Sequence, residues 1–96
     1  MNINMNQICM HIAKLKSINS KQQIRAYLSQ LTPDEVSQIQ ALMYMGQMGV
    51  DNIADIIRKK INAIGQESKE DEIDTIVSKS QNLEKWFNNA EIIIHG

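Results

Sequence analysis

One stretch of the chain predicts a helix with a marked beginning and an apolar second half. It reads LTPDEVSQIQALMYMGQMGVDN, residues 31–52. Thr32 suits the N-cap, Pro33 suits the first helical position, and Glu35 completes a capping box. The first half carries a single apolar stripe, whereas ALMYM is apolar nearly all round, which is typical of a helix buried between neighbours. We therefore expect residues 33–46 to form the central helix of the protein.

Helix signals recur along the rest of the chain. Four glycines and one proline are too few for an all-β protein, which needs a turn every 8–12 residues or so. Ser20, Asp51 and Ser68 are the expected N-caps of three further helices. A break near residues 80–82 precedes the last helix, and the tail EIIIHG is compatible with either a helix or a strand. The sequence predicts an all-α fold, a compact bundle of five or six short helices in a single domain, residues 1–96.

The glycine turn raises the question of a DNA-reading helix-turn-helix. With Gly49 at the turn, Met45 occupies the close helix crossing where Ala or Gly is usual, and the inward position nine residues after the glycine is Arg58. With Gly46 at the turn, the inward position is Gln47. Neither register suits the motif, so the sequence argues for a helical core and against DNA reading by this stretch.

Residues 31–49 resemble a family of small bacterial proteins of unknown function. The family signature is close to Glu-Leu-Val-Ala-Leu-Met-Trp-Leu-Gly-Arg-Gly. The positions that coincide with it are Ala41, Leu42, Met43 and Gly46. Tyr44 stands where the signature has Trp, and Gln47 where it has Arg. The resemblance implies a helical fold and no assigned activity.

Charge is unevenly distributed although the net charge is only −1. Residues 1–32 carry four bases and no acid, and residues 33–57 carry four acids and no base. In one interpretation these opposite charges face each other within the fold or lie in solvent. In the other, a basic surface binds an acidic partner. The residues of that surface would be Lys14, Lys16, Lys21 and Arg25. They are few beside the dense basic surfaces of nucleic-acid-binding proteins, so nucleic acid is the less favoured partner.

Residues suited to catalysis or metal binding are sparse. Cys9 and His11 point about 200° apart on a helix, so they cannot share a metal ion, and we expect a buried thiol and a histidine at the rim. The loop GQMG lacks the pattern and the lysine of a phosphate loop. The acidic run ESKEDEID lacks the central glycine of a calcium loop. We expect a protein that is not an enzyme and that binds no metal or cofactor.

The core prediction centres on two helices. It names Ile39, Leu42, Met43, Ile53, Ile57 and Ile61. In the last helix Leu83, Phe87 and Ala90 share the inward face, which leaves Trp86 at its edge.

Apolar residues near the ends of two helices are candidates for a partner surface. The methionines around Tyr44 serve either as core filling or as an adaptable contact surface. Three successive isoleucines cannot all point inward from a helix or a strand, so at least one is expected in an exposed patch. The candidate partner-binding residues are Tyr44, Met45, Met48, Trp86, Ile92, Ile93 and Ile94. Burial of the tail within the monomer is the alternative.

The function expected from these features is that of a small non-catalytic binding or regulatory module acting through protein–protein contacts. A homodimer or another protein would cover the C-terminal patch. A cytoplasmic location is expected because Cys9 has no intramolecular disulfide partner, and because the sequence shows neither a signal peptide nor an apolar run of about 20 residues. Two alternatives stay open. One is a mobile-element (phage-type) inhibitor of a bacterial defence complex such as CRISPR, and the other is a nucleic-acid-associated protein using the basic N-terminal third.

Overall fold

Helices account for nearly all of the described chain in the computed structural model of the protein. Residues 5–49, 52, 54–56, 58 and 67–95 are described. The helices are α1 (Met5–Lys16), α2 (Lys21–Ser29), α3 (Pro33–Met48), α5 (Lys69–Ser78) and α6 (Leu83–His95), with a 3₁₀ turn, η1 (Ser80–Asn82), before α6. Within these ranges there is no strand, which confirms the predicted all-α bundle. None of these helices combines the length and the apolar character needed to cross a membrane.

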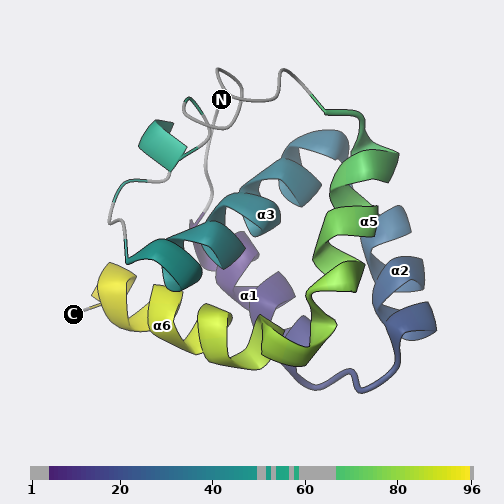
Figure 1. Cartoon of the computed structure of the whole chain (residues 1–96), viewed down its shortest axis with the longest axis horizontal. Helices are drawn as coiled ribbons and strands as arrows, with labels where there is room; N and C mark the ends of the chain where they lie inside the picture. The colour runs from purple at the N-terminus through teal and green to yellow at the C-terminus, as the bar shows by residue number, and fades with distance from the viewer. Residues whose placement is uncertain (1–4, 50–51, 53, 57, 59–66, 96) are drawn as a thin grey trace.

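The central helix is α3, as predicted, and it continues to Met48 rather than stopping at residue 46. It packs most extensively against α6, then against α5 and α1 (Figure 1). The predicted core residues Ile39, Leu42 and Met43 are all fully buried. Gly49 ends the helix with a φ of 74°, a left-handed conformation that glycine adopts without steric cost.

The start of α3 is fixed by the predicted capping box. The backbone N–H of Glu35 donates to Thr32 Oγ1 at 3.1 Å, and the backbone N–H of Thr32 donates to Glu35 Oε1 at 2.9 Å. The Ser20 and Ser68 hydroxyls accept single cap bonds at the starts of α2 and α5, which confirms both predicted caps. Each cap satisfies a backbone donor that the helix itself leaves unpaired.

Several predictions for the segment between α3 and α5 concern residues that the structure does not describe. Asp51, the expected cap, and the expected core residues Ile53, Ile57 and Ile61 lie outside the described residues. In the part that is described, Asn52 Oδ1 accepts from the backbone N–H of Asp55 at 3.2 Å, which is an N-cap contact one residue after the predicted one.

A shared hydrophobic core joins the five helices named above and also includes Ile56. Its fully or nearly fully buried members are Ile8, Ile12, Leu15, Ile24, Leu28, Val36, Ile39, Ala41, Leu42, Met43, Met45, Ile56, Ile73, Ile76, Val77, Leu83, Phe87 and Ala90. The predicted inward face of the last helix is confirmed, because Leu83, Phe87 and Ala90 are at most 2% exposed. Trp86 lies beside them, partly buried, as expected for the edge of that face.

The crossing of α3 and α6 depends on Gly46. A Cβ atom built on Gly46 would lie only 1.7 Å from the carbonyl oxygen of Trp86. The Asn89 side chain also donates to the Gly46 carbonyl at 3.4 Å. The two helix backbones therefore approach each other at a position where only glycine leaves room.

Candidate functional site

The tail that sequence periodicity left open is helical, because α6 continues without a break to His95. Its three isoleucines separate as a helix requires. Ile92 is 68% exposed, whereas Ile93 and Ile94 are partly buried against the core. The expectation that at least one of the three faces solvent is confirmed, and the other two contribute in part to the monomer core.

The candidate residues at the end of α3 fall in three different environments. Met45 is 1% exposed, so it fills the core and is not available to a partner in this fold. Tyr44 is partly buried against the core. Met48, in the last turn, is 55% exposed. Core filling is thus the correct interpretation for Met45, and only Met48 is largely open to solvent.

Met48 and Ile92 lie in the last turns of two helices that pack against each other. The C-terminal turns of α3 and α6 lie together at one edge of the molecule (Figure 1), next to the close crossing at Gly46. We call this region the helix-end surface and define it by Met48, Ile92, Ile93 and Ile94. Met10 of α1, the other exposed large apolar side chain among the described residues, is 62% exposed.

Two of the four predicted basic residues form ion pairs between helices. Lys16 Nζ lies 2.7 Å from Glu91 Oε1 and also donates to Asn88 of α6, and Arg25 Nη1 lies 2.6 Å from Asp74 Oδ1 of α5. Lys14 and Lys21 are exposed. For Lys16 and Arg25, opposite charges face each other between helices, which reduces the positive charge left for an acidic partner.

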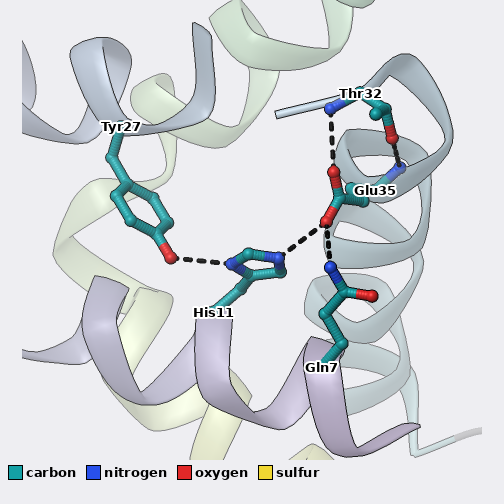
Figure 2. A network of polar contacts seen from close by, with 5 residues as sticks. All are labelled: Gln7, His11, Tyr27, Thr32 and Glu35. Atoms are coloured by element: carbon teal, nitrogen blue, oxygen red, sulfur yellow. Dashed lines mark hydrogen bonds and ion pairs between the residues drawn. The ribbon is translucent and has the colours of Figure 1, made fainter. Parts of the chain in front are cut away.

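A polar cluster at the junction of α1, α2 and α3 was not anticipated from the sequence (Figure 2). His11 is 6% exposed, so the expected histidine at the rim is wrong. Its Nδ1 lies 2.7 Å from the Tyr27 hydroxyl, and its Nε2 lies 2.8 Å from Glu35 Oε2. Gln7 Nε2 donates to the same carboxylate oxygen at 2.9 Å. The expected buried thiol is only partly correct, because Cys9 is partly exposed.

The protonation of this cluster follows from its geometry. The backbone N–H of Thr32, followed by the His11 ring, lowers the pKa of Glu35 below its ordinary value. Burial, and then the Glu35 carboxylate, raises the pKa of Tyr27. Near neutral pH the site therefore holds a carboxylate that only accepts hydrogen bonds and a phenol that keeps its proton.

One signal in the sequence could have indicated the cluster. A capping box uses a single oxygen of its glutamate, here Oε1 of Glu35. The second oxygen needs another donor when the helix start is covered by a neighbouring helix. Pairing that oxygen with His11, however, requires knowledge of how α1 packs on α3.

A small recess lies where the loop after α1 meets the start of α6. It encloses about 210 Å³, with Leu15, Ile24 and Leu83 among its lining residues and Lys16 and Glu84 contributing polar groups. Ligand pockets commonly measure roughly 300–1,000 Å³. In the described parts of the chain, no group of three or more His, Cys, Asp or Glu side chains lies close enough together to hold a metal ion.

Comparison of the chain with protein-family models, curated proteins and solved structures gave no match. The resemblance of residues 31–49 to a small bacterial family stays a prediction. The fold and the surface chemistry are therefore the basis on which a function is proposed.

Proposed function

We propose that the protein is a small non-catalytic binding module that contacts another protein chain through the helix-end surface. The observation that supports this most directly is the exposure of Ile92, 68%, on a helix whose neighbouring turns are well packed. A single exposed isoleucine is ordinary on a protein surface. Here it adjoins two partly exposed isoleucines in the sequence, and its helix ends near the end of α3, which carries the exposed Met48.

The chemistry of this surface suits protein contacts. Isoleucine supplies apolar area that gains from removal from water, at about 25 cal/mol per Å². Methionine adapts its shape to different partners because its side chain is unbranched and flexible. A contact limited to two helix ends is small, and interfaces below about 1,200 Å² are commonly weak or transient. We therefore expect reversible association rather than an obligate complex.

Self-association is the partner to test first, because it needs no second component. Analytical ultracentrifugation of the full chain over a range of concentrations should show a monomer–dimer equilibrium. Ile92→Glu should shift this equilibrium to monomer without lowering the melting temperature, because the side chain is largely exposed. Met10→Glu is the matched control, since it places the same charge on another exposed apolar position, in α1.

A second experiment covers a partner other than the chain itself. The wild-type protein and the Ile92→Glu and Met10→Glu variants are used as three baits in the native host, and bound proteins are identified by mass spectrometry. A protein retained by wild type and by Met10→Glu, but lost with Ile92→Glu, supports the proposal. If that protein belongs to a defence complex, the result favours the alternative of an inhibitor of that complex. A monomeric wild-type chain together with identical captures by all three baits overturns the proposal.

A further inference from the structure

His11 joins three helices through its two ring nitrogens. From α1 it reaches Tyr27 of α2 through Nδ1 and Glu35 of α3 through Nε2, at 2.7 Å and 2.8 Å. Figure 2 shows the ring between these two side chains. The contacts span 16 and 24 residues of sequence, so they fix tertiary packing rather than local structure.

The two partners of His11 differ in whether they can donate a hydrogen bond as well as accept one. The Glu35 carboxylate accepts hydrogen bonds only, so Nε2 must carry a proton and donate to it. The Tyr27 hydroxyl can both donate and accept. When the ring is neutral, Nδ1 is bare and accepts the hydroxyl proton. When the ring is charged, Nδ1–H donates to the hydroxyl oxygen, and the phenol proton rotates away.

Both ring nitrogens therefore keep a hydrogen-bond partner in either charge state, with the heavy atoms at the same positions. Glu35 is held from the other side in either state, because the backbone N–H of Thr32 donates to Oε1 and Gln7 donates to Oε2. The edge-on arrangement of the two rings, with their planes at 67°, leaves the hydroxyl directed toward Nδ1.

We propose that the cluster of His11, Tyr27 and Glu35 is a proton-tolerant junction, which keeps α1 docked on α2 and α3 whether the imidazole is neutral or charged. Tyr27 provides this tolerance by reversing the direction of one hydrogen bond. This inference is independent of the proposed binding function.

The other charged groups near the His11 ring do not alter these hydrogen-bond directions. From α3 the group that faces it is Glu35, and from α2 it is Tyr27. On the side of α1 that meets α6, the charged contact is the pair of Lys16 and Glu91, more than one helical turn away along α1. Glu35 and Tyr27 keep their charge states between about pH 5.5 and pH 8, because their pKa values are shifted away from that range.

The variant Tyr27→Phe tests the junction. In this variant Nδ1 of a neutral ring is an acceptor without a donor. In a charged ring, Nδ1–H is a buried donor without an acceptor, and this second state costs more free energy. Relative to wild type, its unfolding equilibrium constant should rise by about tenfold more at a pH where nitrogen-15 NMR shows the ring charged than at a pH where it shows the ring neutral. Tyr44→Phe is the matched control, because it removes the hydroxyl of the other tyrosine. Its difference from wild type should be the same at both pH values.

A measurement on the wild-type protein gives a second readout. Nitrogen-15 NMR of the histidine rings should show neutral His11 with the proton on Nε2 and none on Nδ1. The exposed His95 serves as the internal reference. A neutral ring protonated on Nδ1 overturns the proposal, and so does a Tyr27→Phe difference that does not change with the charge of the ring.

Discussion

Gly46 sets the distance between the two helices that pack most extensively against each other. The missing side chain allows the α6 backbone at Trp86 to lie directly against α3. The atoms that an added methyl group would meet are backbone atoms of a packed helix, which cannot rotate aside as a side chain could.

Gly46→Ala should destabilise the protein by roughly 3 kcal/mol, because α3 and α6 must move apart to admit the methyl group. Intrinsic helix propensity alone would change stability in the opposite direction, by about 1 kcal/mol. Urea unfolding provides the measurement. Gly49→Ala is the control. A Cβ there meets nothing within 4 Å, so only the positive φ costs energy, roughly 1 kcal/mol. Equal effects at the two glycines would show that the close crossing is not present.

Glu35 makes the stability of the protein depend on pH in the acid range. Its pKa is lowered in the folded state from the ordinary value of 4.5. The carboxylate therefore contributes stability that is present above pH 4.5 and is lost as the pH falls through the lower folded pKa. Glu35→Gln should be less stable than wild type near neutral pH, and the difference should shrink on acidification below that value. Thermal melts at several pH values measure it, with Asp34→Asn as the control for net charge. A difference that stays constant down to about pH 2 would contradict the assignment.

At the scale of single helices, the reach of each contact decides what the sequence could predict. The caps at Thr32, Ser20 and Ser68 join residues three apart, so the local pattern was sufficient to find them. The apolar periodicity of α3 and α6 likewise identified their buried faces. The exposure of His11 was predicted wrongly because its partners lie on two other helices. The same limit applies to Gly46, whose role depends on the path of α6.

The caps should differ in strength. Thr32→Ala should cost about 1 kcal/mol, because it removes the hydroxyl half of a reciprocal pair. Ser20→Ala should cost less, since its cap bond is longer, 3.4 Å, and has no reciprocal contact among the described bonds. Thr32→Ser keeps the oxygen and is the control. Urea unfolding of the three variants gives the order, and a larger loss for Ser20→Ala would contradict it.

For the molecule as a whole, the end of α6 has two roles that different variants separate. Glu91 pairs with Lys16, and Ile93 and Ile94 pack partly against the core. Ending the chain at Ala90 should therefore lower the free energy of unfolding by roughly 2–3 kcal/mol. Ile92→Ser should change it by less than about 0.5 kcal/mol.

Urea unfolding at low protein concentration, where the chain is monomeric, compares these two variants. The comparison also shows why truncation is a poor test of association, because it removes core contacts together with the surface. If Ile92→Ser destabilises the monomer as much as the truncation does, the tail is buried and the helix-end surface is not available.

The link between α1 and α6 has a consequence for how the chain folds during synthesis. Lys16 finds its partners Asn88 and Glu91 at sequence separations of 72 and 75 residues, whereas His11 has both of its partners within 24 residues. On the ribosome, α1, α2 and the start of α3 can join as soon as residue 35 has emerged. The side of α3 that α6 covers is completed only when residues 83–95 are made. Until then it lacks the cover that α6 provides, and uncovered apolar surface is where growing chains meet chaperones or other unfinished chains.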